Sequence, residues 1–132
     1  MRYLLDTNTC IAVMRNHAAA VKRMRAVGPP DCAVSTITSY ELYTGVAKCV
    51  NPANEQTKRE LLLNTIQVVP FDVTAAKEAA RLRAFLESKG QAIGPYDTLL
   101  AGQALALSLI VATAKTGEFT RVPGLIVENW QI

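Results

Sequence analysis

Short apolar runs alternate along the chain with longer segments in which apolar residues recur every three to four positions. The short runs have the length and β-branched content of buried strands. They cover residues 3–5, 32–34, 66–70, 109–112 and 125–127. The longer segments have the period of helices that bury one face, and they cover residues 7–14, 17–27, 35–48, 53–64, 74–89 and 95–107. Strands that alternate with helices predict an α/β fold, with a mainly parallel sheet of four to five strands and helices on both faces.

Residues at the segment boundaries are typical of helix ends. Ser35 or Thr36 is a good N-cap for the helix that follows, and Asp72 is a cap or turn residue before the next long helix. Gly90 can end that helix in the left-handed conformation. We expect the polar helix over residues 53–64 to expose Lys58, Arg59 and Glu60. Residues 113–118 are expected to form a loop.

Composition narrows the class of protein. A chain of 132 residues is long enough for one domain, residues 1–132, with its own core. Half of its residues are hydrophobic and 19% are charged, which excludes a disordered chain, and the net charge of +3 permits a nucleic-acid partner without requiring one. Three dispersed cysteines without a CxxC pair argue against a disulfide framework or zinc site and fit a reducing cytoplasm. No signal peptide or membrane-spanning segment is visible, so we expect a soluble cytoplasmic protein.

Four acids follow the predicted strands at positions that can reach one crevice. Asp6 comes directly after the first strand, Glu41 lies in the helix after the second, Asp97 begins a later helix, and Glu118 follows the fourth strand. The carboxyl ends of parallel strands face the binding crevice of such sheets. Clustered carboxylates repel one another unless a cation lies among them, and an all-oxygen set without histidine or paired cysteines suits Mg²⁺ or Mn²⁺. The sequence therefore predicts a site for a hard divalent ion.

Each acid also has a purely structural explanation. Asp6 can cap a helix that begins at the next residue, and Asp97 lies where an acid complements the helix dipole. Thr38 and Glu41 match a capping box, but the helix begins before Thr38, which leaves Glu41 beyond its first turn. Gly45 shares a helix face with Glu41 and lets something large approach that acid.

Segments around these acids resemble a known family. They read LLDTNTCI, STITSYELYTGVAK, GPYDTLLAGQA and TAKTGEFTRVPGLIVENW, in that order along nearly the whole chain. This combination resembles the PIN-domain ribonucleases, and within them the VapC toxins of bacterial toxin–antitoxin pairs. The resemblance implies a metal-dependent endoribonuclease that forms a homodimer, with tRNA as one suggested substrate and products that end in 5′-phosphate and 3′-hydroxyl. It also implies inhibition by a VapB antitoxin whose tail occupies the active-site groove.

The resemblance also assigns roles to individual residues. It implies that Asp6, Glu41 and Asp97 are the catalytic, metal-binding acids, and that Asn8 and Thr113 support them. One position departs from the family pattern, because Lys115 stands where Asp or Asn is usual. A lysine that points into the cluster would compete with the metal. The alternative is that Lys115 turns outward and Glu118 completes the metal site.

Two other functions are open at this point. With Lys115 in the metal site, the protein could bind RNA or its antitoxin without efficient cleavage. A phosphoacceptor signalling domain would need Asp72 as the acceptor and a second acid beside Asp6, where this chain has Thr7. The basic segment over residues 15–25, together with Lys48, is either a phosphate-binding surface or a solvated face.

Overall fold

The computed structural model describes residues 1–132 and contains five strands and seven α-helices. The strands are β1 (Tyr3–Leu5), β2 (Cys32–Ser35), β3 (Gln67–Val69), β4 (Ile110–Ala112) and β5 (Val127–Glu128). The α-helices are α1 (Thr7–Met14), α2 (Ala18–Val27), α3 (Thr36–Lys48), α4 (Pro52–Thr65), α5 (Val73–Ser88), α6 (Pro95–Leu107) and α7 (Thr116–Phe119), with a 3₁₀ turn over Pro29–Asp31. No helix has the length and apolar character needed to cross a bilayer. All three cysteines are free thiols.

The five strands form one sheet in the order β3-β2-β1-β4-β5, and every pair is parallel. The chain leaves β1 toward β2 on one side, and β4 later pairs with β1 on the other. The strand order therefore reverses between β1 and β4, and crevices form at such reversals beyond the carboxyl ends of the strands. The predicted α/β fold with a parallel sheet is confirmed.

Two predictions for the C-terminal part of the chain were wrong. The last strand is Val127–Glu128 rather than residues 125–127, because its ladder pairs Val111 with Val127 and Ala112 with Glu128. Residues 113–118 do not form a plain loop, since the short helix α7 begins at Thr116. A single turn of helix is too short to produce a periodic pattern in the sequence.

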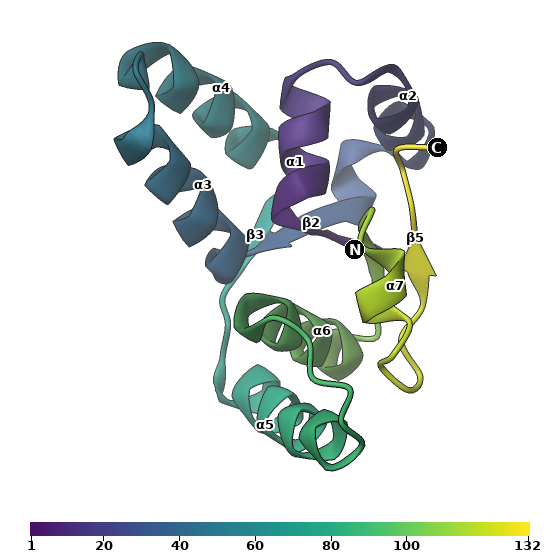
Figure 1. Ribbon diagram of the computed structural model, residues 1–132. Helices are drawn as coiled ribbons and strands as arrows, with labels where there is room; N and C mark the ends of the chain where they lie inside the picture. Colours follow the sequence, from purple (N-terminus) through teal and green to yellow (C-terminus); the bar gives the residue numbers. More distant parts are fainter.

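Helices cover both faces of the sheet, with α1 to α4 on one side and α5 and α6 on the other (Figure 1). Alternation of side chains along the strands produces the two halves of the core. On β1, Leu4 packs with residues of α5 and α6, whereas Tyr3 and Leu5 pack with residues of α1, α2 and α4. The central strands are therefore buried on both faces, as their unbroken apolar runs predicted.

Helices α5 and α6 pack unusually closely at one glycine. A Cβ added to Gly102 on α6 would lie 2.5 Å from the Ala79 Cα of α5 and 2.6 Å from its backbone nitrogen. Only hydrogen fits between these two backbones. This contact fixes α6 against α5, and the first turn of α6 carries Asp97.

The predicted helix ends are confirmed. The Ser35 hydroxyl accepts a hydrogen bond from the backbone N–H of Ile37, and the Asp72 carboxylate accepts one from Ala75. Gly90 follows α5 with φ +64°, in the left-handed region. Because Asp72 is engaged as a cap, the structure gives no support to its role as a phosphoacceptor.

Arg59 corrects an expectation from the sequence. Its side chain is buried, whereas the polar character of α4 predicted exposure. The guanidinium donates to the Leu42 carbonyl oxygen at 2.9 Å and pairs with Glu55 one turn earlier. It also lies 3.2 Å from the position of a Gly45 Cβ. The large group that approaches Gly45 is thus Arg59 itself, which joins α4 to α3.

A polar cluster anchors the C-terminal strand. The Glu128 carboxylate accepts hydrogen bonds from the Tyr3 hydroxyl at 3.1 Å, the Trp130 indole N–H at 3.1 Å and the Arg23 guanidinium. Arg23 also donates to the Tyr3 hydroxyl at 2.9 Å. The Arg23 hydrogen bond, followed by smaller contributions from Tyr3 and Trp130, lowers the pKa of Glu128 despite its partial burial. Arg23 is therefore a structural ion-pair partner rather than a free phosphate contact.

We expect Glu128→Gln to destabilise the fold by about 1 kcal/mol at pH 7, because the charged partner of Arg23 is lost. A carboxylate with a lowered folded-state pKa stabilises above its unfolded pKa, and this contribution disappears as the pH falls through the folded value. The difference between wild type and variant should therefore shrink toward pH 3. Urea unfolding at both pH values measures it. Glu87→Gln, which removes an exposed ion pair with Arg83, is the matched control and should change stability little. A difference in unfolding free energy that is equally large at both pH values would contradict this explanation.

Candidate functional site

Asp6 lies at the reversal point between β1 and β4. Its backbone N–H donates to the Ala112 carbonyl oxygen at 3.1 Å, which continues the pairing of the two strands. Its carboxylate accepts hydrogen bonds from the Thr9 backbone N–H at 2.8 Å and from the Thr113 hydroxyl at 2.5 Å. Asp6 is only 3% exposed. It therefore caps α1, as the structural explanation required, and also presents a fixed carboxylate at the edge of the crevice.

Glu41 and Asp97 reach the same place from other elements. Glu41 projects from the second turn of α3 and accepts a hydrogen bond from the Thr7 hydroxyl at 2.8 Å. Asp97 lies in the first turn of α6 and receives the Lys115 ammonium at 3.2 Å. These three carboxylates, more than 30 residues apart in sequence, thus surround the start of α1.

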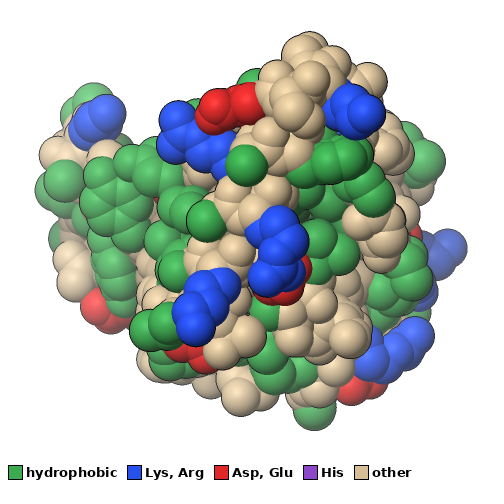
Figure 2. Space-filling view, turned by 90° about the horizontal axis from the view of Figure 1, so that it is seen from below, with side chains coloured by type: hydrophobic (Ala, Val, Ile, Leu, Met, Phe, Trp, Pro, Cys, Tyr) green, Lys and Arg blue, Asp and Glu red, His purple; other side chains and the backbone are tan.

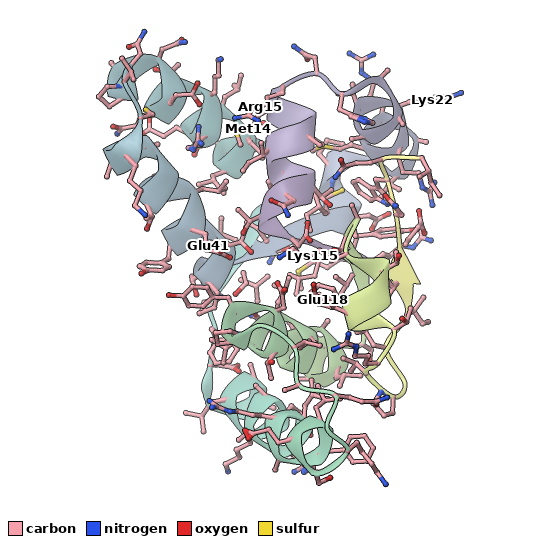
Figure 3. The ribbon with its side chains drawn as sticks, in the orientation of Figure 1. Met14, Arg15, Lys22, Glu41, Lys115 and Glu118 are labelled. Carbon is pink, nitrogen blue, oxygen red and sulfur yellow. The ribbon has the colours of Figure 1, made fainter.

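The three acids line one small cavity of about 60 Å³. Its wall also includes Asn8 and Lys115, both of which the sequence assigned to the site. A cavity of this size holds a few water-sized groups. Glu118 is not part of the wall. It lies on α7, where its charge acts on Lys115, and Figure 3 shows it on the same side of the molecule as Lys115.

Thr113 and Lys115 connect the loop after β4 to the acids. The Thr113 hydroxyl donates to Asp6 and accepts the backbone N–H of Lys115 at 2.9 Å. This arrangement fits the expected supporting role of Thr113. The Lys115 side chain points into the cavity toward Asp97, so of the two orientations considered from the sequence, the structure has the inward one.

The acids of the cavity and the single cation among them, Lys115, shift each other's pKa values. Burial raises the pKa of Asp6, as does the nearby charge of Asp97, while the hydrogen bonds from Thr113 and Thr9 oppose that rise. Burial alone would lower the pKa of Lys115. The hydrogen bond to Asp97 and the charges of Asp97, Glu118 and Asp6 outweigh it and raise the pKa. Lys115 is therefore held as a positive charge among the acids.

The three carboxylates have the oxygen ligands that a hard divalent ion prefers, but they do not converge on one point. No three His, Cys, Asp or Glu residues lie close enough together to hold an ion as they stand. Each acid is instead engaged by its own donor: Asp6 by Thr113, Glu41 by Thr7 and Asp97 by Lys115. At Asp97, the Lys115 ammonium supplies the positive charge that a bound metal ion would otherwise supply. Carboxylate oxygens are the ligands that Mg²⁺ and Mn²⁺ prefer.

Other cavities and basic residues lie elsewhere. A mainly apolar cavity of about 490 Å³ lies beside α5 and α6. Its charged side chains, Arg83 and Glu87, pair with each other at 2.9 Å. In Figure 3, Arg15 and Lys22 lie at the far end of α1 and on α2, away from Glu41 and Lys115. This basic segment is therefore not part of the acid cavity.

Five residues of the cavity wall were not identified from the sequence: Thr7, Ile37, Thr38, Tyr96 and Leu100. Among them, Thr7 orients Glu41 through its hydroxyl. Tyr96 directly precedes Asp97 and Tyr40 directly precedes Glu41, which is a signal that the sequence did contain.

Comparison with known proteins gives concordant results. The family model described as PIN domain matches residues 3–125. The chain is 33% identical over 130 residues to the tRNA(fMet)-specific endonuclease VapC of Salmonella typhimurium, covering 98% of each protein. It is also 33% identical over 132 residues to ribonuclease VapC2 of Rickettsia felis, again covering 98% of each. The crystal structure of DNA-bound VapBC from Salmonella typhimurium contains a chain that superposes with a TM-score of 0.93 at 34% identity, covering 98% of both chains.

Proposed function

The chain belongs to the PIN-domain family, and from this premise we propose that it is a VapC-type toxin that hydrolyses RNA phosphodiester bonds. The observation that carries the proposal is the convergence of Asp6, Glu41 and Asp97, from three separate elements, on one polar cavity. Both compared relatives are named as nucleases, and their similarity extends over the whole chain. We place the protein in the cytoplasm, where its RNA substrates are.

We propose that Asp6, Glu41 and Asp97 are the metal ligands and that the ion is Mg²⁺ or Mn²⁺. Glu118, which lies outside the cavity wall, is proposed as an additional acid near the ion. When bound, such an ion makes water more acidic and offsets the charge that builds up on a phosphate. Thr113 and the Thr9 N–H hold the Asp6 carboxylate in one orientation, and Thr7 does the same for Glu41. These hydrogen bonds fix the orientation of two of the three carboxylates before any substrate arrives.

The reaction we propose adds water to phosphorus in line with the departing sugar oxygen. The P–O3′ bond breaks and O3′ takes up a proton, which leaves 5′-phosphate and 3′-hydroxyl ends. This chemistry does not use the 2′-hydroxyl as a nucleophile, so selection of RNA must come from shape and groove contacts. We propose tRNA as one substrate class, because one relative is a tRNA(fMet)-specific endonuclease. The proposed protein partners are a VapB-type antitoxin, as in the solved VapBC relative, and a second copy of this chain.

The direct test is cleavage of total cellular RNA by the purified chain, with Mn²⁺ or with EDTA. We expect discrete fragments only in the presence of the ion, with ends that a ligase specific for 5′-phosphate can join. Cleavage that persists in EDTA, or 2′,3′-cyclic phosphate ends, would contradict the proposed reaction.

A second candidate function rests on Lys115. Its ammonium neutralises Asp97 and lies in the cavity where the ion would bind. The chain could therefore bind RNA or an antitoxin while cleaving weakly. Cleavage at physiological Mg²⁺ separates the two candidates.

We expect Lys115→Asn to increase Mn²⁺ affinity by about tenfold, because one internal positive charge that competes with the ion is removed. RNA cleavage at limiting Mn²⁺ should rise as well. Isothermal titration of the RNA-free protein measures the first effect. Lys77→Asn, a lysine on α5 outside the cavity, is the control and should titrate like wild type. Equal affinities for Lys115→Asn and wild type would refute competition between Lys115 and the ion.

A further inference from the structure

Tyrosine side chains lie beside the acid cavity in an arrangement that the proposed hydrolysis does not use. Of the four tyrosines in the chain, Tyr40, Tyr43 and Tyr96 are exposed, at 56%, 46% and 43%. Tyr40 and Tyr43 lie on α3, and Tyr96 lies on α6. Hydrophobic side chains, a class that includes tyrosine in this view, gather on the side of the molecule where α3 lies (Figure 2).

Tyr40 and Tyr96 meet across the two helices. Their rings are packed edge to face, with centroids 5.8 Å apart, and their hydroxyls are 3.5 Å apart. Edge-to-face packing is a preferred arrangement of aromatic pairs, and both side chains remain largely exposed to solvent. The pair therefore forms one exposed aromatic surface rather than two independent side chains.

This surface is continuous with the acid cavity. Tyr96 is part of the cavity wall together with the three acids. Tyr96 directly precedes Asp97, and Tyr40 directly precedes Glu41, so each ring is fixed one residue away from a proposed metal ligand. An RNA phosphate bound at the acids would place its neighbouring base within reach of these rings.

We propose that Tyr40 and Tyr96 form a stacking platform for an unpaired nucleobase next to the phosphate that is cut. The proposal rests on the proposed function and assigns to these two rings the contact with an unpaired base at the cleavage site. Aromatic rings stack on any base, whereas bases inside an A-form duplex are covered by their neighbours and cannot reach a protein ring. The preference for RNA that is unpaired at the site then follows from the two rings.

Binding without cleavage tests the platform independently of catalysis. The probe is a fluorescein-labelled RNA of about 12 nucleotides, single-stranded or annealed to its complement, measured by anisotropy in EDTA. We expect Tyr40→Ala and Tyr96→Ala each to weaken single-strand binding by about tenfold, and the corresponding Phe variants to bind within about twofold of wild type. The duplex should bind more weakly to wild type and should respond little to either Ala variant.

The control variant is Phe85→Ala, which removes another exposed aromatic ring, on α5. It should bind both probes like wild type. Three binding results would each overturn the platform: Ala variants that bind as wild type does, Phe variants that bind as weakly as Ala variants, or equal losses on single strand and duplex. A change of oligomeric state in the Ala variants by light scattering would instead assign the rings to a contact between copies, and would also overturn it.

Steady-state cleavage of total tRNA in Mn²⁺ separates this proposal from the proposed function. With the platform present, the Ala variants raise KM more than they lower kcat. If wild type binds through the tyrosines in EDTA but cuts no RNA with Mn²⁺, the platform stands and the nuclease function fails. If wild type cuts and the variants match it in KM, the platform fails alone.

Discussion

Asp97→Asn should lower RNA cleavage by about 100-fold or more while leaving the fold in place. The substitution keeps the size and polarity of the side chain but removes one negative charge from the proposed metal site, and metal-assisted charge stabilisation is worth several kcal/mol in the transition state. Asp97 suits this test because it does not cap α6, and the only hydrogen bond of its carboxylate is with the Lys115 ammonium. Initial rates on total tRNA at saturating Mn²⁺ measure the effect.

The matched control is Asp72→Asn. Asp72 is also an acid at a helix start, but it caps α5 and lies outside the acid cavity. Asparagine caps helices as well as aspartate does, so this variant should cut RNA at the wild-type rate. Activity of Asp97→Asn within a few-fold of wild type would remove Asp97 from the catalytic machinery.

Asp6→Ala is a less informative substitution at the same site. It would remove the cap of α1 and leave the Thr113 hydroxyl and the Thr9 N–H without their partner. We expect a loss of about 2 kcal/mol in unfolding free energy, so lost activity would be ambiguous.

Gly102→Ala should destabilise the protein by about 3 kcal/mol, the largest stability effect that we expect from a single methyl group. The new Cβ would lie 2.5 Å from the Ala79 Cα, and because the clash is with backbone, α5 and α6 must separate to relieve it. For a chain of this length the loss corresponds to a fall in Tm of roughly 10 °C. Thermal unfolding followed by circular dichroism measures it.

Gly117→Ala is the control for the previous variant. Gly117 lies in α7, and apart from its chain neighbours and the backbone of its own helix no heavy atom lies within 4 Å of the place that its new methyl group would take, so the substitution adds a side chain in open space. Its Tm should equal or slightly exceed that of wild type, because alanine favours helix more than glycine does. A fall in Tm for Gly102→Ala no larger than that for Gly117→Ala would mean that the helices can separate at little cost.

The parallel sheet and most helix ends could be predicted because local signals and tertiary packing agree at these positions. The apolar run at residues 3–5 is buried on both faces of the sheet. Ser35 and Asp72 cap the starts of their helices, as the sequence predicted. Arg59 was mispredicted because burial of a guanidinium depends on distant partners. Its contact with the Leu42 carbonyl oxygen joins two helices and leaves no local pattern.

The candidate site likewise combines features that the sequence predicted with features that it did not predict. Strand ends pointed to Asp6, and topology brought Glu41 and Asp97 to the same cavity. The orientation of Lys115 could not be predicted, because a long flexible side chain can reach either solvent or an acid. The pairings of Thr7 with Glu41 and of Thr113 with Asp6 depend on side-chain geometry that no spacing rule encodes.

Isothermal titration of Mn²⁺ into the RNA-free protein measures the metal site without RNA, antitoxin or cleavage. We predict saturable binding by wild type that is lost in Asp97→Asn and retained in Asp72→Asn. Absence of binding by wild type, or equal binding by wild type and Asp97→Asn, would contradict this prediction.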